Sequence, residues 1–433
     1  MAAYSIKTIF WNHWKSVKQI LSRRYEPSHW ESIVSAVEKM LSCRDPSIGY
    51  KEYMCTKCGE TKKVSFTCKS RFCTSCGKKY VDEWVNKTVD KIINVAHRHI
   101  VFTIPEELRR SVFNMLFLIR VMSDCASKTA LEVLQSQGSE AIPGILAVVH
   151  TFGGDLKFNP HVHLLMTEGG LTNGNAWKDI PFLPYNLLRK KWQYHLLTEV
   201  KKHLPKTREH AKFIDRLFKK NPKGFYVNGE SKMTSARYTS RYIGRYLARP
   251  ALAEYRISRY DGNQVKFWYE SHETGKREYR TLNVVDFISR LITHIPLKGF
   301  KMVRRYGLYS RRSKGIPLET LKGCRRFVQM TLDFFKDLPK KLSWRQRLIA
   351  SFGKDPLICP HCKQEMELWS IWHPDYGYIY DFCRDSSAVE PEFEKNLQKA
   401  EDKERIENSR KAVQLSLFDA LNFDGRLIIQ PCF

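Results

Sequence analysis

Two histidines separated by a single residue form the first group in this sequence that could do chemistry. They lie in the segment Asn159-Pro160-His161-Val162-His163. In an extended strand, residues two apart lie on the same side of the sheet, so the two imidazole rings would point the same way. Two imidazoles on one face of a sheet can bind a divalent cation. Taken alone, the spacing is also compatible with two histidines of purely structural role.

Two tyrosines form the second group. Tyr242 and Tyr246 lie four residues apart, and Tyr238 continues the same spacing, so all three phenols would share one face of a helix. A phenolic oxygen can attack a phosphodiester when a nearby metal ion polarises the phosphate and favours loss of the phenol proton. An aromatic stripe that packs into a protein core would have the same spacing.

Cysteines with the spacing of metal ligands form the third group. Two Cys-x-x-Cys pairs, each followed by glycine, lie close together in the N-terminal part of the chain, and their members are Cys55, Cys58, Cys73 and Cys76. Four thiolates on two tight turns match the tetrahedral shell of a structural zinc ion, so we predict one zinc site here. A redox-active or incidental cluster is the alternative. Cys43 and Cys68 are extra thiols that could replace a ligand or bind a second ion.

A further Cys-x-x-Cys pair, Cys359 and Cys362, lies near the C-terminal end. His373 and Cys383 could complete a second four-ligand zinc site with this pair, and Cys324 is another candidate ligand. A lone reduced pair in a turn is the alternative reading.

The charge of the chain indicates the class of partner. The 433 residues include 73 Lys and Arg against 45 Asp and Glu, a formal net charge of +28 that is spread along the chain. Such an excess favours a polyanionic partner, because neutralised phosphates release condensed counterions. The apolar stretches are too short to span a bilayer and no secretory signal is present, so we expect a soluble cytoplasmic protein.

Strands and helices must position these groups. The histidine pair falls in a predicted strand over residues 161–167, and a neighbouring strand over 144–151 contains His150. The tyrosines fall in a predicted helix over 235–248. The remaining predicted elements are a strand at 99–104, helices at 106–137, 187–203 and 208–219, and a hairpin of 264–269 with 277–281. A sheet covered by helices on one face would fit this order.

The combination of motifs resembles a known family, the rolling-circle transposases of the insertion-sequence ninety-one group, which are two-tyrosine HUH nucleases. The resemblance extends between residues 43 and 310. Its blocks are Cys68-Lys-Ser-Arg71-Phe-Cys73-Thr-Ser-Cys76-Gly, His150-Thr-Phe-Gly-Gly, Asn159-Pro-His161-Val-His163 with Gly169-Gly170-Leu171, Tyr242-Ile-Gly-Arg-Tyr246-Leu-Ala-Arg249, and Phe287-Ile-Ser-Arg with Arg304-Arg305-Tyr306-Gly307.

The resemblance implies an α+β fold with a central antiparallel sheet, the two histidines on a middle strand and helices across one face. It also implies three parts of the chain. Residues 1–96 would form a helical and zinc-binding module that holds DNA, such as a hairpin at a transposon end. Residues 97–310 would form the HUH nuclease domain, and residues 311–433 a C-terminal module with the candidate second zinc site.

The resemblance further assigns roles to residues. His161 and His163 would bind a catalytic Mg²⁺ or Mn²⁺ ion, and Tyr242 and Tyr246 would be the nucleophiles. For the third ligand we favour His150, because a neighbouring antiparallel strand could place it beside the pair, with Asp155 as the alternative. Arginines on or near the tyrosine helix would contact DNA phosphates, namely Arg241, Arg245 and Arg249.

The implied activity is nicking and rejoining of single-stranded transposon ends through a 5′-phosphotyrosine, in a protein associated with the bacterial nucleoid. A plasmid replication initiator or a relaxase would use the same chemistry on another substrate. A non-catalytic, zinc-dependent nucleic-acid-binding regulator is the alternative from a different class, and it would leave the histidine and tyrosine pairs unexplained.

Overall fold

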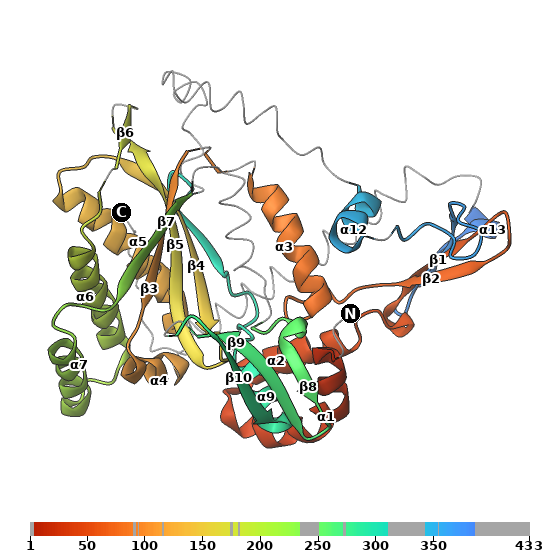
Figure 1. The fold of residues 1–433 in the computed structure, drawn as a ribbon, viewed down its shortest axis with the longest axis horizontal. Coiled ribbons are helices and arrows are strands. Elements are labelled where there is room, and N and C mark those ends of the chain that lie inside the picture. Colours follow the sequence, from red (N-terminus) through yellow and green to blue (C-terminus); the bar gives the residue numbers. More distant parts are fainter. Residues whose placement is uncertain are drawn as a thin grey trace, which may run out of the picture. The chain divides into compact units, whose positions relative to one another are not determined.

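A computed structural model describes residues 4–89, 92–93, 95–114, 117–173, 176–180, 182–233, 251–271, 274–310, 343–353 and 355–385 (Figure 1). The described residues form two compact units. The first consists of residues up to 43 together with 67–356, and the second of residues 44–66 together with the segment from 357 onward.

The first unit is built around an antiparallel sheet of six strands. The strand order is β11-β4-β5-β3-β7, and β6 pairs with the far end of β5. The bounds are β3 His97–Thr103, β4 Ile142–Phe152, β5 Phe158–Leu171, β6 Trp177–Asp179, β7 Val227–Met233 and β11 Val303–Gly307. The long strand β5 lies between β4 and β3, so its residues have a partner strand on both sides.

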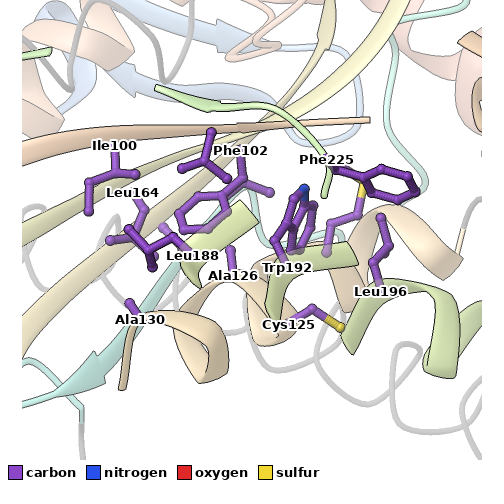
Figure 2. Close-up of a cluster of buried hydrophobic side chains, with 14 of the residues drawn as sticks. Ile100, Phe102, Cys125, Ala126, Ala130, Leu164, Leu188, Trp192, Leu196 and Phe225 are labelled. Atoms are coloured by element: carbon purple, nitrogen blue, oxygen red, sulfur yellow. The ribbon is translucent and has the colours of Figure 1, made fainter. Parts of the chain in front are cut away.

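Helices cover one face of this sheet and enclose the main core (Figure 1). They are α4 Glu106–Asn114, α5 Phe117–Ser136, α6 Tyr185–His203 and α7 Arg208–Lys220. Every second residue of the strands, such as Phe102 and Leu164, packs against α5 and α6 (Figure 2). Trp192 of α6 is fully buried at the centre, and its Nε1 donates a hydrogen bond to the Thr103 carbonyl at 2.8 Å.

The opposite face of the sheet carries a smaller apolar layer. Leu146, Val148 and Leu165 pack there with Ile92 and Tyr309. The helix α3 Thr74–Val89 contributes Trp84 to the edge of this layer, and Glu83 of α3 pairs with Arg347 of α12 Trp344–Phe352. Polar residues of β4 and β5 lie on the same face of the sheet, beside this apolar layer.

A second core in the same unit joins the N-terminal helices to a segment far along the chain. It combines α1 Ile6–Leu21 and α2 Pro27–Leu41 with α9 Val284–Ile292 and with a three-stranded antiparallel sheet in the order β10-β9-β8. The remaining bounds here are η1 Ser22–Arg24, η3 Glu254–Arg256, β8 Ile257–Tyr260, β9 Gln264–Glu270 and β10 Arg277–Asn283. Ser5 caps α1 by accepting the Thr8 N–H at 3.0 Å, which fixes where the helix begins.

The second unit is a four-stranded antiparallel sheet in the order β13-β12-β1-β2. Its elements are η2 Pro46–Ile48, β1 Tyr50–Met54, β2 Thr61–Ser65, β12 Glu367–His373, β13 Gly377–Asp381 and α13 Phe382–Asp385. β1 pairs with β12, so strands from the two ends of the chain lie side by side in one sheet.

The predicted α+β class with antiparallel sheets is confirmed, and so are the strands that carry His150, His161 and His163. The hairpin predicted at 264–269 and 277–281 is β9 and β10. The predicted helix 235–248 lies outside the described residues. The second core combines residues from both sides of position 96, and the four-stranded sheet combines residues 44–66 with residues after 357. The predicted division of the chain at residues 96 and 310 stays a prediction. None of the helices in the described ranges is long and apolar enough to cross a membrane.

Candidate functional site

Three histidines come together on β4 and β5. His150 lies directly opposite His161 in the antiparallel register, and His163 lies two residues further along β5. Val149 and Val162, which alternate with these histidines, are buried in the core under the helices, so the three imidazoles lie on the opposite face of the sheet. One nitrogen from each ring lies within 4.8 Å of the others.

The distances between the rings fit the shell of a single metal ion. The Nε2 atoms of His161 and His163 are 3.0 Å apart. Two ligands held at right angles, each about 2.1 Å from a cation, would lie about 3.0 Å from each other. The centroid of His150 lies 4.6 Å from that of His163 and 5.4 Å from that of His161. The residues present therefore fit a divalent cation.

Hydrogen bonds on the far side of the rings orient the nitrogens. Nδ1 of His161 lies 2.7 Å from the backbone carbonyl of Asn159, so this nitrogen carries the proton and Nε2 keeps its lone pair for a metal. Nδ1 of His163 lies 2.8 Å from Nε2 of His99, and donation from His163 in this pair leaves its Nε2 unprotonated as well.

His99, on β3, is a residue that the sequence analysis missed. It is buried, and its ring stacks on that of His163 with a centroid distance of 5.0 Å. The signal was present in the sequence, since His97-Arg98-His99 has the same alternate spacing as His161 and His163.

The surroundings of His163 favour its neutral form. Burial, together with the neighbouring His150, His161 and His99, holds the pKa of His163 well below its usual range. Neutral imidazole is the form that binds metal ions, so His163 needs no proton release at neutral pH before a cation can bind.

Asp155, the alternative third ligand, lies in the turn between β4 and β5. Its carboxylate accepts the Lys157 N–H at 3.1 Å and lies 3.5 Å from the Arg280 guanidinium. It is not among the residues whose ligand atoms gather with the histidines in the described part of the chain. Of the two candidates for the third ligand, the fold brings His150 to the pair.

The predicted nucleophiles Tyr242 and Tyr246 lie outside the described residues, and so do the predicted DNA contacts Arg241, Arg245 and Arg249. Their roles stay predictions.

The predicted zinc ligand set of Cys55, Cys58, Cys73 and Cys76 is wrong, because the structure divides these cysteines between two clusters. The physical reason is a hairpin. Residues 44–66 fold back on themselves, and the Arg44 N–H donates to the Phe66 carbonyl at the base, so Cys43 and Cys68 meet just outside it. Cys55 and Cys58 lie at its tip.

The first cluster consists of Cys43, Cys68, Cys73 and Cys76. Sγ of Cys76 lies 3.6 Å from Sγ of both Cys43 and Cys68. Cys43 and Cys68 therefore take the places beside Cys73 and Cys76 that were predicted for Cys55 and Cys58.

The second cluster consists of Cys55, Cys58, Cys359 and Cys362. His373 and Cys383, predicted to complete a site with Cys359 and Cys362, are not part of it. His373 lies at the end of β12, where its Nδ1 accepts the Asp375 N–H, and Cys383 is exposed. The prediction of these two ligands is therefore wrong. Cys324 lies outside the described residues.

An aromatic and basic surface lies on the outer face of β9 and β10. We call it the Trp268 face, made of Tyr255, Arg256, Lys266, Trp268, Arg277 and Tyr279. Val265 and Phe267 alternate with its residues and are buried inside. The guanidinium carbons of Arg277 and Arg256 lie 4.1 and 5.3 Å from the Trp268 ring centre, and Tyr255 and Tyr279 are 62% and 57% exposed. Aromatic rings beside arginines form a surface on which nucleic-acid bases can stack.

Comparison with known proteins gives a consistent result. A family described as "Putative transposase" matches residues 144–315, and one described as "Transposase zinc-binding domain" matches residues 9–104. The chain is 30% identical over 295 residues to the transposase for insertion sequence element IS801 of Pseudomonas savastanoi pv. phaseolicola, covering 65% of this chain and 71% of that protein. It is 24% identical over 352 residues to the putative transposase y4qJ of Sinorhizobium fredii, covering 77% of this chain and 86% of that protein. No solved structure matches the chain at a significant level.

Proposed function

Since the chain belongs to the insertion-sequence ninety-one family of transposases, we propose that it nicks and rejoins single-stranded DNA at transposon ends through a covalent phosphotyrosine. The observation that carries this proposal is the convergence of His150, His161 and His163 on one face of the sheet. Such a site is what a metal-dependent phosphodiester-cleaving enzyme needs, and the alternative of a protein that only binds DNA leaves it unexplained.

The histidines would hold Mg²⁺ or Mn²⁺. When bound, the cation would polarise the scissile phosphate and favour ionisation of an attacking phenol. Because imidazole nitrogen is a softer ligand than the oxygens that Mg²⁺ prefers, we expect Mn²⁺ to bind more tightly than Mg²⁺.

Tyr242 or Tyr246 would supply the nucleophile. The phenol loses its proton to solvent, its oxygen bonds to phosphorus, and the bond from phosphorus to the 3′ oxygen breaks. That oxygen takes up a proton, which leaves a free 3′-hydroxyl and a 5′-phosphotyrosine. The number of phosphoester bonds is unchanged, so the step needs no nucleoside triphosphate, and attack by another 3′-hydroxyl reverses it to rejoin strands.

Basic and aromatic side chains would hold the DNA. Arg241, Arg245 and Arg249 are the proposed phosphate contacts beside the nucleophiles. The Trp268 face supports binding of a single strand, since exposed rings can stack on unpaired bases. We expect the protein to act at the nucleoid.

The test uses labelled single-stranded oligonucleotides that carry the DNA flanking the coding sequence. With Mn²⁺ present, the protein should form an adduct that survives denaturing electrophoresis. The double variant Tyr242→Phe with Tyr246→Phe should form none while binding the oligonucleotide as before, because phenylalanine keeps the ring and removes the attacking oxygen. Tyr194→Phe, at an exposed position on α6, is the matched control and should form the adduct normally.

Three results would contradict the proposal. Undiminished adduct in the double variant would remove the tyrosines from the mechanism. Absence of any metal-dependent nicking by the wild-type protein, with binding intact, would favour a non-catalytic regulator. A preference for a plasmid origin over transposon ends would indicate a replication initiator or a relaxase.

A further inference from the structure

The second cysteine cluster joins two segments that are far apart in the sequence. Sγ of Cys55 lies 3.3 Å from Sγ of Cys362, and Sγ of Cys58 lies 3.7 Å from Sγ of Cys359. Thiolates on one zinc ion, each bonded at about 2.3 Å in a tetrahedron, lie about 3.8 Å apart, whereas disulfide sulfurs lie about 2.05 Å apart. The distances therefore fit a shared metal ion and not a pair of disulfides.

The two Cys-x-x-Cys turns have the same backbone hydrogen bonds. In the first turn, the Cys55 N–H donates to the Glu60 carbonyl and the Gly59 N–H donates to the Cys55 carbonyl. In the second, the Cys359 N–H donates to the Gln364 carbonyl and the Lys363 N–H donates to the Cys359 carbonyl.

The residue after the second cysteine of each turn adopts the same unusual conformation. Gly59 has φ of 72° and Lys363 has φ of 61°, both in the left-handed region. Glycine enters this region without cost, but lysine rarely does. A lysine held there indicates that the surrounding turn imposes its shape, as expected where the turn must direct two thiolates and several N–H groups at one ion.

Strand pairing brings the two turns together. β1, which precedes Cys55, pairs with β12, which follows Cys362, from Tyr50 opposite Trp372 to Met54 opposite Glu367. The apolar core of this unit is small: its main cluster has Tyr53, Cys55, Cys359 and Met366 as buried members among the described residues, and Ile371 of β12 is buried as well. A sheet with so little buried apolar surface needs a further cross-link to be stable.

We propose that the chain binds two structural zinc ions and that Cys55, Cys58, Cys359 and Cys362 hold the second of them. This ion closes a discontinuous module made of residues 44–66 and 357–385. The match to the zinc-binding domain ends at residue 104, so two of the four ligands lie outside that domain. The other ion belongs to Cys43, Cys68, Cys73 and Cys76, and it owes no ligand to the C-terminal segment.

Zinc stoichiometry of the full-length protein tests this assignment. Elemental analysis after extensive dialysis should give two zinc ions per wild-type chain. The double variant Cys359→Ser with Cys362→Ser should keep one ion, and so should Cys55→Ser with Cys58→Ser. The variant with all four substitutions should also keep one ion, because both pairs serve the same site. Cys383→Ser, an exposed cysteine of the same module, is the control and should keep two.

Cobalt substitution gives a second measurement that does not depend on counting ions. The wild-type protein loaded with Co²⁺ should show the visible absorption of tetrathiolate sites, and either double variant should halve it. One ion in the wild-type chain, two ions in either double variant, or fewer ions in the fourfold variant than in the doubles would overturn the proposal. Loss of both ions on substitution of Cys359 and Cys362 would overturn it too, since the first site would then depend on them.

Discussion

His99 contacts one of the proposed metal ligands from behind and can therefore affect how well the site binds a cation. Its Nε2 lies 2.8 Å from Nδ1 of His163, on the side of the ring that faces away from His161. Partners of this kind fix the orientation and tautomer of a metal-binding histidine. We therefore regard His99 as a positioning residue.

Replacing His99 by phenylalanine should lower the affinity for Mn²⁺ about 10- to 100-fold, because His163 then loses the partner of Nδ1 while the ring volume is kept. His99→Gln, whose amide oxygen can accept the same proton, should restore part of the affinity. Calorimetric titration with Mn²⁺ at constant pH measures both. Equal affinity for wild type and the phenylalanine variant would show that His99 only fills space.

Two other histidines, the buried His97 and the half-buried His294, predict how stability depends on pH. Burial lowers the pKa of both His97 and His294 to about 4 in the folded protein, against 6.5 when exposed. Between these two pH values, both histidines are protonated in the unfolded chain but neutral in the folded chain, so the free energy of unfolding falls as the pH falls. Each histidine contributes a loss of about 1.4 kcal/mol per pH unit in this window.

Denaturant unfolding between pH 7 and pH 4 measures this slope. His97→Gln should reduce the slope of the unfolding free energy against pH by the contribution of one proton, about 1.4 kcal/mol per pH unit. This change in slope is expected whatever the effect of the substitution on stability at pH 7. An unchanged slope in the His97 variant would mean that His97 is protonated in the folded protein.

At the scale of strands and helices, local patterns predicted the elements and long-range pairing decided the sites. Apolar runs bounded by turn residues were sufficient to predict β4 and β5, and with them the common face of His161 and His163. The zinc ligands could not be predicted in the same way. Which Cys-x-x-Cys pairs share an ion depends on the pairing of β1 with β12, and no local pattern near Cys55 contains that information.

The outer face of the β9–β10 hairpin carries its own prediction. Trp268→Ala and Tyr279→Ala should each weaken binding of single-stranded DNA by about 1–3 kcal/mol, because each removes a ring on which a base can stack. Fluorescence anisotropy with a labelled oligonucleotide measures the change. Tyr194→Ala removes a ring of similar exposure from α6 and should have no effect. If all three variants bind the oligonucleotide equally well, the DNA does not contact the Trp268 face.

At the scale of the whole molecule, the fold class followed from the sequence, but the grouping of segments did not. The sequence predicted helices within residues 1–96, but not that α9 and β8–β10 are the packing partners of α1 and α2. Likewise, the C-terminal cysteines showed a metal-binding pattern without indicating an N-terminal partner. Both groupings depend on contacts between residues more than 240 positions apart, such as the Ile6 N–H donating to the Glu254 carboxylate.

The discontinuous sheet has a consequence for biosynthesis. Cys58 leaves the ribosome 301 residues before Cys359, so the hairpin that carries Cys58 must wait until those residues have been made before its partner strand emerges. The Cys43 cluster, by contrast, is complete once residue 76 has appeared. Translation that stops before Cys359 thus yields a product with one complete cysteine cluster and half of the other, and an intact second cluster marks a polypeptide that was translated beyond Cys362.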